Sequence, residues 1–160
     1  SEFKTKINNL DNLDVFIAGM GTGGTIMGFY HYFSQKNNDF KAYPILPDKN
    51  EDGKHRIEGI GDSFIPKIVD LQALSPTLRV NDSDAINIAR QINKLGLSVG
   101  ISSGANMFGA ILKAAELTDN QTVATILCDD NKKYLTTDLC SNSTEKTSQN
   151  IKIINYEIIT

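Results

Sequence analysis

The chain has 160 residues, of which 40% are hydrophobic and 22% are charged, and this is enough for one ordinary globular domain with its own core. Its formal net charge of -3, without any basic stripe, argues against a dedicated nucleic-acid-binding protein, so we expect no nucleic-acid partner. Because no apolar run reaches membrane-spanning length and the N-terminus carries no signal peptide, we also expect no membrane partner and a cytoplasmic location.

The first half of the chain alternates strand and helix patterns. The predicted elements are a buried strand over 14–18, a helix over 24–35 and a second strand over 41–46. Pro44 and Pro47 are expected to stop the second strand near its end, since proline donates no backbone hydrogen bond. The polar stretch 48–54, which contains a glycine, is then predicted to be a loop.

The second half continues this alternation. The predicted elements are a helix over 83–95, a short strand over 97–101, a helix over 104–117 and a β-branched strand over 122–127. Residues 81–84 offer capping side chains ahead of the first of these helices, and Gly96 stands where that helix should stop. Because the strands are apolar throughout rather than alternating, the sequence predicts an α/β fold, an open, mostly parallel sheet with helices on both faces.

The C-terminal end differs in composition from the rest of the chain. Residues 141–149 are polar and indicate a loose linker, whereas 151–159 are apolar enough to dock back on the body. We therefore expect one domain over 1–140, followed by a linker and C-terminal tail over 141–160.

The stretch "GMGTGGTIMG" joins the first predicted strand to the first predicted helix. Gly19, Gly21 and Gly24 formally satisfy the G-x-G-x-x-G pattern of a dinucleotide site, in which a pyrophosphate lies at the helix N-terminus. The acidic residue that such a site needs about twenty positions further on is met only by Asp48, beyond two prolines in a predicted loop. A glycine turn chosen only for tight strand-to-helix packing is the simpler alternative.

The threonine hydroxyls of this stretch favour a phosphate-binding role over a purely structural turn. Thr22 and Thr25 frame two glycines as "GTGGT". Hydroxyls and exposed backbone N–H groups at a helix start suit a single phosphate monoester, which needs no ribose contact. The two cysteines, Cys128 and Cys140, have neither a zinc spacing nor a disulfide framework, so we expect no metal and a reducing compartment.

Four stretches together form a recognisable series. They are "VFIAGMGTGGTIMG", "GKHRIEGIGDSFIPKIVD", "VGISSGANMFGAI" and "CDDNKKYLTTDL". Over about residues 11–139 this series closely resembles, in order and spacing, the C-terminal half of cysteine synthase (O-acetylserine sulfhydrylase). That family belongs to the fold-type II pyridoxal-phosphate enzymes, with cystathionine β-synthase as a relative. The resemblance therefore implies pyridoxal 5′-phosphate as cofactor, an amino-acid substrate, and β-replacement or β-elimination on an O-activated serine or cysteine.

The resemblance also implies roles for individual residues. The cofactor's 5′-phosphate would be bound by the backbone N–H groups and hydroxyls of Gly21, Thr22, Gly23, Gly24 and Thr25. Ser102 would hydrogen-bond the pyridine nitrogen, and a neutral hydroxyl there does not force that nitrogen to stay protonated. The loop that closes over the substrate would contain Gly59, Ile60 and Gly61. From the residues alone, Ser102 and Ser103 could equally cap a helix that begins near Gly104.

Other residues near these motifs have weaker signals. Asp62 stands where the family usually has a small residue, and its carboxylate is either a possible catalytic group that favours release of hydrogen sulfide from cysteine or a solvated acid at a loop tip. Cys128 stands where many relatives have proline and is expected to be a buried, unreactive thiol at a strand end. His55 is expected to anchor its loop through a hydrogen bond, and His31 to lie on a helix surface or in packing.

The catalytic lysine that the resemblance calls for has no match in this sequence. In the family the lysine that forms the Schiff base lies in the N-terminal half, and none of the lysines here stands at a family position. The chain therefore resembles half of an enzyme, inactive alone, that needs a missing N-terminal half or a homodimer partner. Some members of the family also dock serine acetyltransferase, whose contact surface would include the loop around Gly59.

Two other classes of function remain open. A non-catalytic ligand-binding or interaction module could retain this fold, and the missing lysine favours it, whereas the intact phosphate loop and Ser102 do not. A plain nucleotide-binding Rossmann domain is disfavoured because it has no need for the "GISSGA" and "GIGDSFIP" stretches. Within the enzyme hypothesis, O-acetylserine, O-phosphoserine, cysteine and serine with homocysteine all remain possible substrates.

Overall fold

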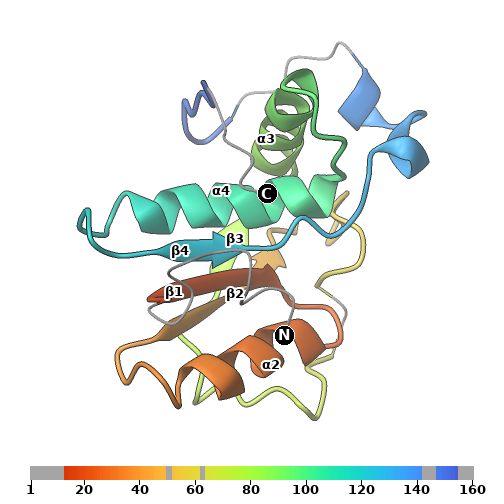
Figure 1. Ribbon diagram of the computed structural model, residues 1–160. Coiled ribbons are helices and arrows are strands. Elements are labelled where there is room, and N and C mark those ends of the chain that lie inside the picture. The colour runs from red at the N-terminus through yellow and green to blue at the C-terminus, as the bar shows by residue number, and fades with distance from the viewer. Residues whose placement is uncertain (1–12, 50–51, 62–63, 142–146, 155–160) are drawn as a thin grey trace.

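A four-stranded parallel sheet lies at the centre of the computed structural model, which describes residues 13–49, 52–61, 64–141 and 147–154 (Figure 1). In chain order the elements are β1 (Val15–Gly19), α2 (Gly24–Phe33), β2 (Lys41–Pro47), β3 (Leu78–Val80), α3 (Asp82–Lys94), α4 (Ile101–Ala114), β4 (Val123–Thr125) and the short 3-10 turns η2 (Lys132–Tyr134) and η3 (Asp138–Cys140). The strand order is β3-β2-β1-β4, and every neighbouring pair is parallel.

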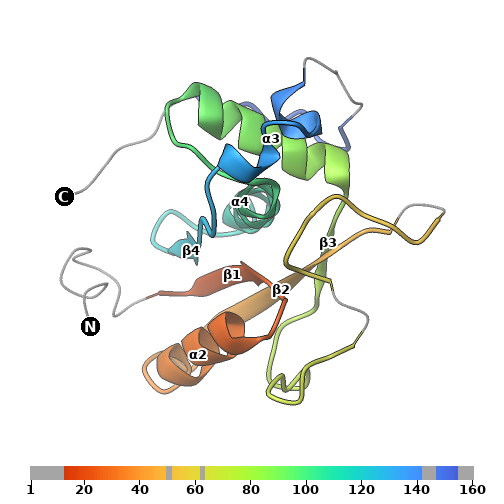
Figure 2. The ribbon, with the colours of Figure 1, turned by 90° about the vertical axis from the view of Figure 1, so that its right-hand side faces the viewer.

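Helices cover both faces of this sheet, so the predicted α/β class is confirmed. Alternate residues of β1 point to opposite faces: Phe16 packs with α2, whereas Val15 and Ile17 pack with α3 and α4. Figure 2 shows α2 on one side of the sheet and α4 on the other, with α3 stacked outside α4. This two-sided burial explains why the strands are apolar throughout.

The strand predicted over 97–101 is wrong, because side chains take the backbone groups that a sheet would need. The amide of Asn93 bonds both backbone groups of Val99, donating to its carbonyl at 3.0 Å and accepting from its N–H at 2.9 Å. The Gly100 N–H donates to the carbonyl of Asp129 at 3.0 Å. Residues 97–100 are therefore an irregular connection, and α4 begins at Ile101 rather than at Gly104.

Two further differences from the predicted elements concern β3, the outer strand of the sheet, and its neighbour β2. This strand was not predicted, since three residues are too few to give a pattern. Pro44 lies inside β2 instead of ending it. Pairing with β3 begins only at Ile45, opposite Leu78, so the missing N–H of Pro44 removes no bond from that ladder.

The described part of the C-terminal tail, residues 151–154, contacts α3 through Gln91. Ile151 and Ile153 pack against the core on the α3 and α4 side of the sheet. The side chain of Gln91 donates to the carbonyl of Ile151 at 2.8 Å and accepts from the N–H of Ile153 at 2.7 Å. Ser148 also contacts α3, because its N–H donates to Asp84 at 2.8 Å. The division at residue 140 stays a prediction.

Replacing Gln91 tests the docking of the tail. Gln91→Ala should lower the free energy of unfolding by about 1–2 kcal/mol, since it removes two partly buried hydrogen bonds worth about 1 kcal/mol each. Urea unfolding of the full chain measures this. The exposed Gln72 provides the control, and Gln72→Ala should leave the midpoint nearly unchanged. Equal effects of the two substitutions would contradict the docking.

Candidate functional site

The carboxyl ends of β1 and β4 lie side by side at one edge of the sheet (Figures 1 and 2). The chain leaves β1 through α2 on one face and reaches β4 from α4 on the opposite face. In open parallel sheets, the crevice at such a reversal is where ligands bind. The loop after β1, the N-terminus of α4 and the segment after β4 all meet here.

The glycine loop after β1 lies against the loop that contains Gly59, Ile60 and Gly61. A Cβ on Gly21 would lie 2.4 Å from the carbonyl oxygen of Gly59, so only glycine allows this approach. The Gly61 N–H donates to the carbonyl of Met20 at 3.2 Å. The structure therefore brings together two of the predicted site segments.

The N-terminus of α2 has the properties of an anion site. Its cap residue, Gly23, has φ 82°, and no side chain in the described part of the chain caps the helix by a hydrogen bond. The first turn carries no acidic residue, and Thr22 and Thr25 are exposed beside it. First-turn N–H groups and the positive end of the helix dipole therefore suit a phosphate monoester, which makes this loop a fit for the 5′-phosphate of the predicted cofactor.

Ser102 and Ser103 are not caps of a later helix, contrary to the alternative considered from the residues. Both lie within the first turn of α4, and both are buried. Their hydroxyls lie 3.2 Å and 3.4 Å from Oδ1 of Asp129, which follows β4. The cap position belongs to Gly100, where a Cβ would lie 2.4 Å from that same oxygen. The close packing of Asp129 on Gly100 thus sets where α4 begins.

Asp129 is the centre of a polar network at this end of α4. Its Oδ2 accepts hydrogen bonds from the Tyr134 hydroxyl at 2.8 Å and from Lys133 Nζ at 2.7 Å. Burial alone would raise the pKa of Asp129, but the bonds from Lys133 and Tyr134, the Lys133 charge and the bond from Ser102 together lower it. Burial and the bond to this carboxylate raise the pKa of Tyr134 to about 12.

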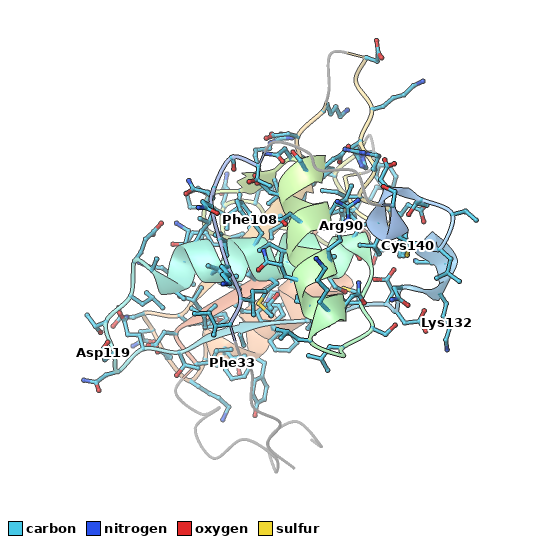
Figure 3. The ribbon with its side chains drawn as sticks, turned by 90° about the horizontal axis from the view of Figure 1, so that it is seen from above. Phe33, Arg90, Phe108, Asp119, Lys132 and Cys140 are labelled. Atoms are coloured by element: carbon cyan, nitrogen blue, oxygen red, sulfur yellow. The ribbon has the colours of Figure 1, made fainter. Side chains whose placement is uncertain are left out.

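The segment that carries Lys133 and Tyr134 is held against α3. Figure 3 shows Arg90 pointing toward the end of this segment near Cys140. The Nε of Arg90 donates to the carbonyl of Leu139 at 3.1 Å, and its guanidinium also bonds the carbonyl of Asp138. No sequence pattern indicated this contact, since a lone arginine on a helix is usually solvated.

Asn106 connects the two strand ends and was missed by the sequence analysis. Its Oδ1 accepts from the Gly19 N–H at 2.7 Å, and its Nδ2 donates to the carbonyl of Ile126 at 2.9 Å. Only 1% of this residue is exposed. The sequence signal for this role was that a polar residue stands among the apolar residues on the predicted buried face of a helix.

Cys128 is exposed, so the prediction of a buried thiol at a strand end is wrong. The reason is that β4 ends at Thr125, before the chain reaches the cysteine. Partial burial of the thiol and the nearby Asp129 charge raise its pKa, which favours the unreactive thiol that was expected. Asp62, the possible catalytic residue, lies outside the described residues.

The predictions for the two histidines have different outcomes. His31 lies exposed on α2, as expected. The Nδ1 atom of His55 is buried and has no hydrogen-bond partner among the residues that the structure describes, so the predicted anchoring bond is not made at this atom. Within the same residues, no group of three or more histidine, cysteine or acidic side chains could hold a metal ion. None of the helices in the described ranges is long and apolar enough to cross a bilayer.

Comparison with protein families finds a match to the model of the family described as "Pyridoxal-phosphate dependent enzyme" over residues 2–129. Among curated proteins, the chain is 41% identical over 140 residues to cysteine synthase B of Campylobacter jejuni, covering 83% of this chain and 46% of that protein. It is 34% identical over 136 residues to cysteine synthase of Staphylococcus aureus, covering 81% of this chain and 44% of the relative. The chain thus spans about half the length of these relatives.

Solved structures agree with these matches. The hydrogen sulfide-producing enzyme of Fusobacterium nucleatum superposes with a TM-score of 0.81 and 41% identity, over 91% of this chain and 46% of that enzyme. The O-acetylserine-dependent cystathionine β-synthase of Helicobacter pylori superposes with a TM-score of 0.73 and 30% identity, over 82% of this chain and 45% of that one.

Proposed function

The chain belongs to the family of pyridoxal-phosphate-dependent enzymes, and on that premise we propose that it is the C-terminal, phosphate-binding half of an enzyme of cysteine metabolism. The first candidate activity is cysteine-synthase-like β-replacement, which forms cysteine from O-acetylserine and sulfide. One observation supports this proposal: the glycine loop after β1 contacts the 59–61 loop, and Ser102 contacts Asp129, which follows the neighbouring strand β4. The identity of 41% to a cysteine synthase over this same region supports it.

Different residues of this site would bind different parts of the cofactor and substrate. Gly21 to Thr25 would bind the 5′-phosphate, because the N-terminus of α2 has no side-chain cap among the described residues and no acidic residue in its first turn. Ser102 would meet the ring nitrogen, and the loop with Gly59, Ile60 and Gly61 would cover the amino-acid substrate. The bound cofactor would supply the electron sink that β-elimination needs, and the protein would supply position and exclusion of water.

We propose that the Schiff-base lysine comes from a part of the protein outside these residues. The chain spans about half of its relatives, so an N-terminal half or a homodimer partner would complete the site. Three apolar side chains near the glycine loop are exposed: 67% of Phe64, 55% of Ile65 and 59% of Ile68 is accessible. Such a patch supports the proposal that another part of the protein covers this surface. Val69 of this segment lies against Gly23. Docking of serine acetyltransferase near Gly59 remains a proposal that rests on the family alone.

Release of hydrogen sulfide from cysteine is the second candidate. The superposition on a hydrogen sulfide-producing enzyme at 41% identity favours it. Asp62 beside the substrate loop would fit this activity, since a carboxylate there could repel an anionic sulfide nucleophile. Assays of the full chain mixed with a separately expressed N-terminal half, with O-acetylserine plus sulfide or with cysteine alone, would distinguish the two. No turnover of either substrate would favour the non-catalytic module.

The phosphate site can be tested without the missing lysine. A suitable probe is 4-deoxypyridoxine 5′-phosphate, in which a methyl group replaces the aldehyde, so that surface lysines cannot capture it. Thr22→Val and Thr25→Val should each weaken its binding about tenfold, because a hydrogen bond to a charged group is worth about 1.5 kcal/mol or more. Isothermal titration of the full chain measures the dissociation constant.

The control is the same substitution at an exposed position away from the crevice. Thr136→Val removes a hydroxyl without approaching the glycine loop and should leave the dissociation constant unchanged. If all three variants bind the probe as the unchanged chain does, the phosphate is held elsewhere and the proposed site is wrong.

A further inference from the structure

Resting on the proposed function, we propose that Arg56 is a positioning residue for the substrate loop, residues 59–61. Its guanidinium lies between Asp82 and Asp138 and fixes the chain three residues before this loop. Arg56 thereby holds the loop beside the glycine loop, where it would cover the amino-acid substrate. It acts through the loop and not by touching the substrate itself.

The substrate loop has a backbone that needs anchoring from outside. Gly59 and Gly61 have φ values of 80° and 81°, and glycine loses more conformational freedom on ordering than any other residue. The loop rests on the glycine loop through Ile60, which lies against Gly19, and through the Gly61 N–H, which donates to the Met20 carbonyl at 3.2 Å. These contacts hold the far side of the loop, so its position also depends on how the chain enters it.

Arg56 fixes this entry through its backbone as well as its side chain. Its N–H donates to Oδ1 of Asp82 at 2.9 Å, and its Nε donates to Oδ2 of the same carboxylate at 3.1 Å. Another nitrogen of the guanidinium pairs with Oδ2 of Asp138. The planar fork of arginine suits such paired contacts, which a single ammonium group cannot reproduce. Because one carboxylate binds both the backbone and the side chain of Arg56, the direction of the chain is fixed together with its position.

The two carboxylates that bind Arg56 belong to firmly placed parts of the fold. Asp82 is the first residue of α3, where the helix dipole favours a negative charge. Only 17% of its side chain is exposed, so solvent and salt screen this ion pair less than a fully exposed one. The backbone carbonyl of Asp138 is bonded in turn by the guanidinium of Arg90 on α3. Arg56 therefore ties the substrate loop to the start of α3 and to η3.

The anchor that the sequence analysis expected from His55 thus belongs to the next residue. The Nδ1 atom of His55 is buried and makes no hydrogen bond within the described residues. A Cβ on Gly61 would lie 3.3 Å from its Nε2, so the imidazole packs against the substrate loop. Such packing limits how closely the loop can approach, whereas the hydrogen bonds of Arg56 also fix its direction.

Amide hydrogen exchange of the full chain, followed by NMR, tests this role. The Gly61 N–H reports on the substrate loop, and the Met20 N–H, which donates to the Ile45 carbonyl at 3.0 Å, reports on the glycine loop beside it. In Arg56→Gln we expect Gly61 to exchange about tenfold faster, the effect of losing one hydrogen bond between charged groups, and Met20 to exchange at an unchanged rate. Arg56→Lys keeps the charge without the fork and should give a smaller increase.

Salt distinguishes a loop held by charges from one held by packing alone. In the unchanged chain, sodium chloride at about 1 M should speed the exchange of Gly61 relative to Met20, because the Debye length falls to about 3 Å. In Arg56→Gln the same salt should have little effect on this ratio. The control is Lys94→Gln, which removes a positive charge from an exposed position at the other end of α3 and should leave the exchange of Gly61 unchanged.

Equal Gly61 exchange in the unchanged chain and in Arg56→Gln would overturn the role of Arg56, and so would equal acceleration of Gly61 and Met20. Neither result bears on the proposed function, which the titration with 4-deoxypyridoxine 5′-phosphate tests separately. Failure of the unchanged chain to bind that probe would count against the proposed function and not against the anchoring of the loop. Should Arg56→Gln fail to fold, a Gly61 exchange rate in the unchanged chain that does not respond to salt would overturn the role of Arg56.

Discussion

Gly104→Ala is expected to lower the free energy of unfolding by about 3 kcal/mol or more, at the upper end of the cost of overpacking a core. Gly104 lies where α4 crosses α3. A Cβ there would lie 2.0 Å from the carbonyl oxygen of Ala85 and 2.9 Å from the Cβ of Ala89. The first neighbour is backbone and cannot rotate away, so the two helices would have to separate.

The same substitution in another helix provides a control of opposite sign. Gly28 lies exposed in α2, and an added Cβ would meet no heavy atom within 4 Å in the described ranges. Gly28→Ala should stabilise the chain by about 0.5–1 kcal/mol, since alanine loses less backbone entropy in a helix. Urea unfolding of both variants measures the difference. A Gly104→Ala variant as stable as the unchanged chain would mean that α3 and α4 do not pack this closely.

Asn106→Leu is the second substitution with a large expected effect. It keeps the side-chain volume but leaves the Gly19 N–H and the Ile126 carbonyl without their partner, both beside the crevice. Each of the two unsatisfied groups costs about 1–3 kcal/mol, so the free energy of unfolding should fall by about 2–6 kcal/mol. Urea unfolding of the full chain measures this loss.

A second measurement separates the local role of Asn106 from general stability. Because Gly19 begins the glycine loop, Asn106→Leu should also weaken the binding of 4-deoxypyridoxine 5′-phosphate under conditions where the variant is still folded. Asn120→Leu, at an exposed position between α4 and β4, should change neither quantity. Loss of stability with unchanged probe binding would show that the glycine loop does not depend on Asn106.

Several parts of the fold could be predicted because their signals are local. The apolar β1, the cap and stop of α3, and the glycine loop between a strand and a helix are short-range patterns. Asn81 caps α3 by accepting from the Asp84 N–H at 2.8 Å, and Gly96 ends it with φ 97°, as the residue types indicated.

The errors occurred where contacts outside a segment decide its local structure. The apolar stretch 97–100 has the composition of a strand, but Asn93 and Asp129 take its backbone groups. Cys128 follows apolar residues, yet β4 stops at Thr125 and leaves the residue exposed, with its thiol only partly buried. Strand propensity does not take account of side-chain hydrogen bonds to the backbone, whether from Asn93 six residues away or across the fold.

The sequence by itself determined the α/β class, the family and the segments that carry the candidate site, because backbone period, glycine placement and motif order are written in neighbouring residues. Only the tertiary structure decided how those segments work together. Asn106 joins the end of β1 to the segment after β4, and Asp129 accepts hydrogen bonds from Ser102 and Tyr134. These contacts join residues that are close in space because the parallel sheet brings its carboxyl ends to one edge, and no local pattern records that proximity.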